Sequence, residues 1–205
     1  MSNTLENVNN SLFWNNKYLK NEFKWELGSP TPIFKNWSQN IPDKSNVKIC
    51  IPGCGRGHDA LYLAKQGFQV YAIDFASEAI NYLKNKSINL NVNLNMFCSD
   101  FFTLDKKFNA FFDYILEYTF YCAINPNKRS DYVNKCYNLL KDNGKIVSIM
   151  LPIDTEFYKG PPFKVNKQEL KSNFINKFKI IKIAKSSFSI EKRSKIELYA
   201  EYEKK

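Results

Sequence analysis

The sequence lacks the patterns that mark several common classes of protein. It has five cysteines but no C-x-x-C pair, and His58 is its only histidine. A structural zinc site needs four Cys or His ligands at close spacing, and that pattern is absent. No stretch of 18 apolar residues occurs, which excludes a membrane-spanning helix. The first residues are polar, without the apolar core of a signal peptide, and the odd cysteine count suits reduced thiols. We therefore expect a cytoplasmic protein without a bound metal.

Arginine is scarce in a chain that is otherwise strongly basic. The 205 residues carry 30 Lys and Arg against 20 Asp and Glu, a net charge of +10, yet only Arg56, Arg129 and Arg193 are arginines. A surplus of this size first suggests a nucleic-acid or anionic-membrane partner. Arginine, however, makes the bidentate phosphate and base contacts, and the lysines are scattered without a run of five. The composition therefore favours a diffuse background charge, with neither nucleic acid nor membrane as a partner.

Internal repeats and low-complexity linkers are also absent. Apolar residues make up 44% of the chain and aromatic residues 16%, which is enough for one full hydrophobic core. We expect a single domain over residues 1–205, with an aromatic N-terminal segment over residues 1–40 and a core over residues 45–205. All three tryptophans lie in the N-terminal segment. For Trp37 we expect ordinary core packing.

The remaining pattern alternates strands with helices and is typical of an α/β fold with a parallel sheet. Short apolar runs predict five strands, at residues 47–51, 69–74, 93–98, 112–116 and 145–151. Helical spacing predicts helices that end at Gly67, begin at Ser77, and cover residues 129–140 and 167–175. The last two strands, at residues 178–184 and 195–203, have no helix between them. They therefore predict an antiparallel hairpin at one end of the sheet.

A glycine loop follows the first strand, and an acid ends the second. The loop reads Gly53-Cys54-Gly55-Arg56-Gly57, and Asp74 stands 21 residues after Gly53, where a carboxylate would meet the hydroxyls of a ribose. The third glycine of the dinucleotide fingerprint is missing, because His58 and Asp59 follow instead. This favours a cofactor with a ribose and no pyrophosphate, such as S-adenosylmethionine. The alternative is a tight turn without a ligand, and for His58 we expect a structural role.

Five segments resemble the thiopurine, thiol and halide methyltransferase family, which uses S-adenosylmethionine. They occur in the family's order and read FKWELGSPTPIF, IPGCGRGHDALYLAKQGFQVYAIDFASEAI, CSDFFTL, FDYILEYTFYCAINPNKRSDY and LPIDTEFYKGPPFKV. The whole resemblance runs from about Trp14 to Val165. The resemblance implies a Rossmann-like, doubly wound sheet of seven strands, mostly parallel with the antiparallel C-terminal hairpin, and a helical N-terminal lid. It also implies a monomer that produces S-adenosylhomocysteine and needs no metal.

The resemblance also implies the residues of the site. The residues implied for the cofactor come from the lid, the loops after the first three strands and the end of the fourth strand: Trp14, Tyr18, Trp25, Gly53, Asp74, Ser99, Asp100, Phe101 and Tyr118. The candidates for the reaction centre are Tyr118 and Glu117, where Glu117 stands in place of the family's Asp. The candidates for the methyl acceptor are Trp14, Phe120, Pro162 and Phe163. For Arg129 we expect a structural role, paired with Asp131 or a carboxylate of a loop.

Methyl transfer from a sulfonium is an in-line displacement that needs no covalent enzyme intermediate. A halide or thiolate acceptor needs little help from a general base, because a thiol is partly ionised near neutral pH. We therefore expect a small soft nucleophile as the acceptor: a thiol, bisulfide, a halide or thiocyanate. The alternatives are a nitrogen or oxygen of a larger metabolite, RNA, or a cofactor sensor without catalysis. The fourth strand lacks the Asn/Asp-Pro-Pro-Tyr/Phe segment of amino-methyltransferases, which argues against RNA.

Overall fold

The computed structural model describes residues 4–153 and 160–205, and the chain divides into two compact units. One unit spans Asn10–Leu104, and the other comprises the chain before Asn10 together with the chain from Asp105 onward. Each unit is an α/β layer structure with its own strands and helices. No helix in the described part of the chain is long and apolar enough to cross a membrane.

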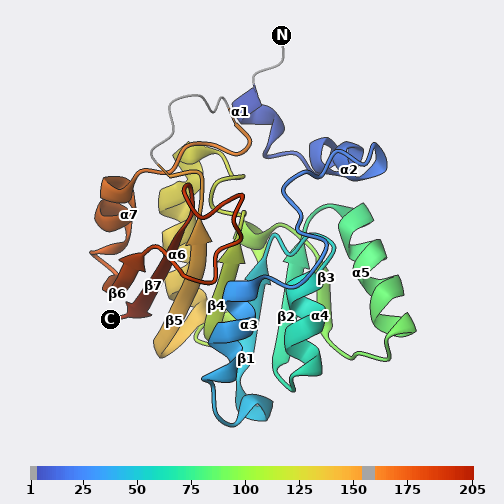
Figure 1. Cartoon of the computed structure of the whole chain (residues 1–205), viewed down its shortest axis with the longest axis horizontal. Coiled ribbons are helices and arrows are strands. Elements are labelled where there is room, and N and C mark those ends of the chain that lie inside the picture. The colour runs from blue at the N-terminus through green and yellow to red at the C-terminus, as the bar shows by residue number, and fades with distance from the viewer. Residues whose placement is uncertain (1–3, 154–159) are drawn as a thin grey trace. The chain divides into compact units, whose positions relative to one another are not determined.

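The Asn10–Leu104 unit holds three parallel strands in the order β3-β2-β1. Its strands are β1 (Lys48–Pro52), β2 (Gln69–Asp74) and β3 (Asn95–Cys98), and its helices are α2 (Ser11–Leu19), α3 (Pro32–Gln39), α4 (His58–Lys65) and α5 (Ser77–Asn89). Two 3₁₀ turns complete it, η1 (Lys44–Asn46) and η2 (Phe101–Thr103). Figure 1 shows α4 and α5 running beside the three strands. The carboxyl ends of all three strands therefore meet at one edge of this sheet.

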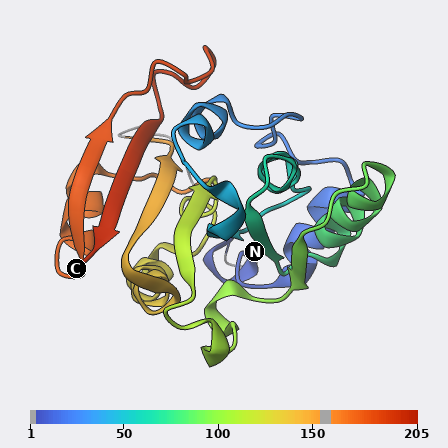
Figure 2. The ribbon, with the colours of Figure 1, turned by 90° about the horizontal axis from the view of Figure 1, so that it is seen from below.

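The other unit holds four strands in the order β4-β5-β7-β6. Its strands are β4 (Phe112–Tyr118), β5 (Leu140–Met150), β6 (Phe178–Ala184) and β7 (Leu198–Lys204), and its helices are α1 (Thr4–Asn7), α6 (Arg129–Leu139) and α7 (Lys167–Phe174), with the 3₁₀ turns η3 (Lys106–Phe108) and η4 (Pro126–Lys128). β4 and β5 are parallel, whereas β7 runs antiparallel to both β5 and β6. Figure 2 shows these four strands side by side with β6 outermost.

The cores follow the periodicities of the sequence. α5 buries Ala79, Ile80 and Leu83 on one face, and β7 buries Leu198, Ala200 and Tyr202 at alternate positions. Aromatic rings fill much of the second core. There the Tyr202 ring stacks on the Phe174 ring with centroids 4.1 Å apart. In the first unit Trp37 stacks on Phe68 with centroids 5.9 Å apart, which agrees with the core packing expected for Trp37.

The predicted α/β pattern, its seven strands and its antiparallel C-terminal pair are confirmed in the described residues. The bounds predicted for residues 69–74 and 178–184 match β2 and β6. The predicted fifth strand was too short, because β5 begins at Leu140 instead of residue 145. In the described residues three α-helices, α1 to α3, precede β1, where a helical N-terminal segment was expected.

Candidate functional site

The loop between β1 and α4 has glycine wherever its backbone requires it. Gly53, Gly55 and Gly57 all have positive φ, at 56°, 54° and 73°. Other residues rarely adopt this conformation, so alternate glycines permit a loop that doubles back within five residues. The amide of Cys54, between the first two glycines, donates to the Ile73 carbonyl at 3.0 Å. The loop is thereby fixed to the end of β2.

Asp74, the last residue of β2, organises this loop. Its Oδ2 accepts from the Gly55 amide and its Oδ1 from the Ala76 amide, both at 2.9 Å. The residue is only 8% exposed. Burial raises the pKa of the Asp74 carboxyl to about 6, although three backbone hydrogen bonds oppose the shift. Because a carboxylate offers about four acceptor sites, the group can still accept a hydrogen bond from a diol.

The residues after β3 lie beside Asp74. The Ser99 amide donates to the Asp74 carbonyl at 3.0 Å. Asp100 caps the η2 turn, where its Oδ1 accepts from the Phe102 amide at 2.9 Å. Phe101 is buried and packs edge-on against Phe102 with centroids 5.8 Å apart. The structure therefore brings Asp74 and Ser99 together and places Asp100 and Phe101 in the turn that follows.

The predicted aromatic residues of the N-terminal segment form one cluster. The Trp25 ring makes edge contacts with Trp14 at 5.6 Å and with Tyr18 at 5.8 Å between centroids. Tyr18 also reaches the glycine loop, since a Cβ added at Gly55 would lie 3.0 Å from the Tyr18 hydroxyl. Burial, and secondly the charge of Asp74, raise the pKa of that hydroxyl. The cluster thus adjoins Gly55 and Asp74, the two residues joined by a hydrogen bond.

Sequence reasoning missed the residues that hold this segment to the loop. Glu26 accepts from Arg56 Nε at 2.7 and 2.9 Å, and it also contacts His58 Nε2. Asp59 accepts from the amide and the hydroxyl of Thr31, at 2.6 and 2.8 Å. The residues that replace the third glycine therefore bind the N-terminal segment, in keeping with the structural role expected for His58. The partners are about 30 residues apart, and no spacing in the sequence indicates these pairs.

Glu117 lies at the end of β4 in the other unit and is fully buried. Its Oε1 accepts from the amides of Phe120 and Tyr121, at 2.7 and 2.8 Å. Its Oε2 is buried and has no hydrogen-bond partner among the described residues. Burial raises the pKa of the Glu117 carboxyl to about 7, against the two backbone bonds and the charge of Arg129. Between these residues Thr119 has a φ of +65°, a strained conformation for a β-branched residue.

Tyr118 is engaged by residues that sequence reasoning did not select. Its hydroxyl contacts Arg193 Nη1 and donates to Glu197 Oε2 at 3.5 Å, and the Arg193 guanidinium lies 5.1 Å from the centre of its ring. Phe120, two residues on, has its ring 6.0 Å from the Tyr132 ring. Arg193 and Glu197 come from the loop between β6 and β7 and its end. The structure thus adds a cation and a second buried acid to the expected tyrosine.

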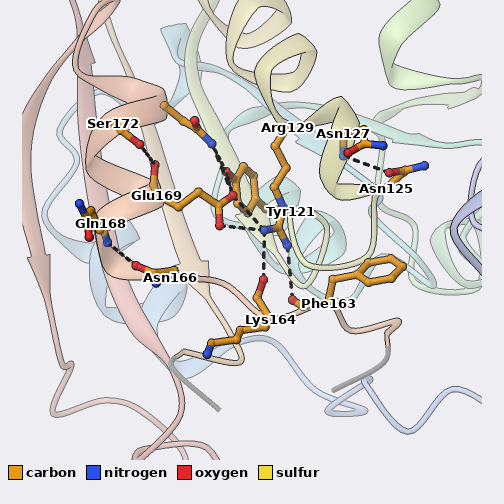
Figure 3. Close-up of polar contacts among 11 residues, drawn as sticks. Tyr121, Asn125, Asn127, Arg129, Phe163, Lys164, Asn166, Gln168, Glu169 and Ser172 are labelled. Atoms are coloured by element: carbon orange, nitrogen blue, oxygen red, sulfur yellow. Dashed lines mark hydrogen bonds and ion pairs between the residues drawn. The ribbon is translucent and has the colours of Figure 1, made fainter. Parts of the chain in front are cut away.

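The Gly-Pro-Pro-Phe segment is held by its backbone. Phe163 is 7% exposed, its amide donates to the Cys122 carbonyl at 2.6 Å, and its carbonyl accepts from Arg129 Nη2 at 3.4 Å (Figure 3). Pro162 precedes it and is half-buried. Among the described residues Arg129 pairs with Glu169 of α7 at 2.9 Å, where a pair with Asp131 or with a carboxylate of a loop was expected. Residues 154–159 of the matching segment lie outside the described residues.

Replacing Glu117 by Gln is expected to flatten the pH dependence of stability. With a pKa near 4.5 when unfolded and about 7 when folded, the carboxyl binds more protons in the folded chain between these values. The free energy of unfolding therefore falls as pH rises through this window, by ~3 kcal/mol for a fully buried group. Urea unfolding of the wild type and the Glu117→Gln variant at about pH 5 and about pH 8 measures this. Glu191→Gln, at an exposed site, is the control, and equal pH dependence in wild type and Glu117→Gln would contradict the expectation.

Comparisons with known proteins find similar sequences over nearly the whole chain. The profile of the family described as Thiopurine S-methyltransferase (TPMT) matches residues 9–204. Probable thiol methyltransferase 2 of Arabidopsis thaliana is 30% identical over 205 residues, which cover 98% of this chain and 88% of that protein. Thiocyanate methyltransferase 1 of Brassica oleracea is 30% identical over 176 residues, covering 82% of this chain and 74% of that protein.

A solved structure supports the fold. The 1,6-didemethyltoxoflavin-N1-methyltransferase of Burkholderia thailandensis, solved with 1,6-didemethyltoxoflavin and S-adenosylhomocysteine, superposes with a TM-score of 0.74. The match covers 95% of this chain and 86% of that one, at 16% identity. The Rossmann-like fold expected from the sequence is thereby confirmed.

Proposed function

The chain belongs to the thiopurine S-methyltransferase family, and on that premise we propose that it transfers the methyl group of S-adenosylmethionine to a small soft nucleophile. The acceptor class is a thiol, bisulfide, a halide or thiocyanate. The observation that carries this proposal is the family match over residues 9–204, and two relatives at 30% identity are named thiol and thiocyanate methyltransferases.

The residues of the Asn10–Leu104 unit fit the cofactor. The Asp74 carboxylate has acceptor capacity for the ribose hydroxyls, and the positive-φ glycines expose backbone for close approach. The faces of Trp14, Tyr18 and Trp25 suit a sulfonium cation, an attraction of roughly 0.5–2 kcal/mol. When bound, S-adenosylmethionine supplies an electrophilic methyl carbon. We assign the adenine to residues 99–101.

The residues of the other unit suit an anionic acceptor. Arg193 brings a positive charge to the Tyr118 hydroxyl, and Glu197 orients that hydroxyl. We propose that Tyr118 and Arg193 bind the nucleophile, with Phe120, Pro162 and Phe163 as apolar walls. The lone pair of the nucleophile forms the new bond to carbon while the electron pair of the broken carbon–sulfur bond returns to sulfur. A thiolate or halide carries no proton, so no base is needed. Glu117 then holds the backbone of the turn and is not required to accept a proton.

A panel of acceptors tests the function. The wild-type protein is incubated with S-adenosylmethionine and iodide, bisulfide, methanethiol or a thiopurine, and methylated product and S-adenosylhomocysteine are measured. We expect stoichiometric formation of both with at least one of these acceptors. Cofactor binding without methylation of any of them would contradict the acceptor class. Salt-sensitive methylation of RNA would favour the alternative instead.

Replacing Arg193 by Gln is expected to lower kcat/KM for the best anionic acceptor by about 10- to 100-fold, because a hydrogen bond to a charged group contributes roughly 1.5–3 kcal/mol. The affinity for S-adenosylmethionine, measured by calorimetry, should stay unchanged. Lys192→Gln is a matched control, since it removes the neighbouring charge at an exposed position. Equal losses in the two variants would show that net charge alone matters.

A further inference from the structure

Two segments proposed to form the acceptor pocket are joined directly. They are residues 118–122, which begin at the last residue of β4, and residues 163–165, before α7. The Phe163 amide donates to the Cys122 carbonyl at 2.6 Å, and the Val165 amide donates to the Pro152 carbonyl at 2.9 Å. The position of Phe163 is therefore tied to the turn that carries Tyr118.

Arg129, the first residue of α6, binds the backbone of the second segment, residues 163–165. Its Nη1 donates to the Lys164 carbonyl at 3.0 Å, and its Nη2 donates to the Phe163 carbonyl at 3.4 Å (Figure 3). Only 4% of Arg129 is exposed. Water cannot replace these bonds easily at such a site, so the guanidinium fixes two consecutive carbonyls.

Further contacts connect Arg129 to the first segment, residues 118–122, through Glu169 and Tyr121. Glu169 of α7 accepts from Arg129 Nη1 at 2.9 and 3.0 Å and from the Tyr121 hydroxyl at 3.1 Å. The Arg129 guanidinium also lies 4.8 Å from the centre of the Tyr121 ring. The Tyr121 backbone is held in turn by Glu117. Arg129 therefore contacts both segments, one through carbonyls and the other through an aromatic side chain.

We propose that Arg129 is a positioning residue that sets the acceptor selectivity of the enzyme. It fixes Phe163 and the turn of residues 118–122 relative to each other, and so determines the space between them. This inference rests on the proposed function of these segments as pocket walls. It assigns Arg129 no contact with the reacting atoms.

Lysine cannot take over this role. The planar guanidinium bonds two carbonyls and a carboxylate while its face covers the Tyr121 ring. The ammonium of lysine is a compact charge on a flexible stem, so it cannot bond both carbonyls and the carboxylate while also covering the Tyr121 ring. Arg129→Lys therefore keeps the charge near Glu169 but releases Phe163.

The test compares two acceptors of different size, bisulfide and benzenethiol. We expect Arg129→Lys to change the ratio of their kcat/KM values by about tenfold, since differences in pocket fit have this size. The affinity for S-adenosylmethionine by calorimetry should stay within about twofold of the wild type. The ratio does not depend on the fraction of folded enzyme, so a merely structural role would leave it unmoved. Glu169→Gln, which keeps the size of the side chain, should shift the ratio in the same direction.

Lys141→Gln is the matched control. It removes an ion pair of 2.7 Å with Asp113 in the same unit, outside the network, and should leave the ratio unchanged. An unchanged ratio in folded Arg129→Lys and Glu169→Gln would overturn the proposal, and so would loss of cooperative unfolding in both. A wild type that binds S-adenosylmethionine but methylates neither of these thiols, nor iodide or thiocyanate, would instead refute the proposed acceptor class.

Discussion

The Asp74→Ala variant is expected to bind S-adenosylmethionine about 100-fold or more weakly than the wild type. The substitution removes the acceptor proposed for the ribose hydroxyls, and hydrogen bonds to charged groups contribute roughly 1.5–3 kcal/mol each. It also removes the acceptor of the Gly55 and Ala76 amides, so the glycine loop loses one of its two bonds to β2 and keeps the bond from the Cys54 amide to the Ile73 carbonyl. Calorimetric titration of the folded variant with the cofactor measures the effect.

Asp43→Ala is the matched control for this experiment. Asp43 lies in the same unit and also accepts two local hydrogen bonds, from Ser45 and Asn46, but at an exposed position. The control makes the same change in charge and should keep the wild-type affinity. Wild-type affinity in folded Asp74→Ala would refute the assignment of the ribose to Asp74.

Gly57→Ala is expected to reduce the free energy of unfolding by about 2–5 kcal/mol, combining left-handed backbone strain with overpacking. Gly57 has a φ of +73°. An added Cβ would lie 2.4 Å from Cδ1 and 3.0 Å from Cγ of Leu83. Leu83 is fully buried in the core face of α5, so its side chain has little room to move. Urea unfolding measures the loss.

Gly28 supplies a control, because it has nearly the same positive φ as Gly57 but open space around an added Cβ. Its φ is +72°, and nothing lies within 4 Å of an added Cβ. Gly28→Ala should therefore show the strain alone, about 1 kcal/mol. Leu83→Ala should partly relieve the clash, so the double variant with Gly57→Ala should lose less stability than the sum of the single losses. Equal losses in Gly28→Ala and Gly57→Ala would show that the contact with Leu83 is unimportant.

Much of the fold was predictable because local pattern and tertiary pairing agree. The runs QVYAID and FKIIKIA are bounded by polar residues or turns, and β2 and β6 have those bounds. β5 is different, since Lys141, Asp142 and Asn143 interrupt its apolar pattern and Asn143 has a φ of +61°. Its first residue, Leu140, pairs with Phe112 of β4 before a shift in register. The long-range pairing extends this strand beyond its apolar run.

The residues of the candidate site likewise divide into those that the sequence predicts and those that it does not. The positions of the glycine loop and Asp74 were predictable, because the loop directly follows β1 and Asp74 is the last residue of β2. The role of Arg193 was not predictable, because its contact with Tyr118 joins residues 75 positions apart in the sequence. The pair of Arg129 and Glu169 spans 40 residues and depends on where α7 packs against α6. Such pairs follow from topology, and one sequence gives no local signal for them.

β7 lies between β5 and β6 in the sheet, although it is synthesised after both, and this order affects how the sheet forms during translation. β6 leaves the ribosome first, but its only strand partner among the described residues is β7. β5 likewise keeps one open edge until β7 exists. Until residues 198–204 have been made, one edge of β5 and both edges of β6 therefore stay unpaired and open to other chains. β7 pairs with both strands at once and leaves, among the described residues, only the outer edge of β6 unpaired on that side of the sheet.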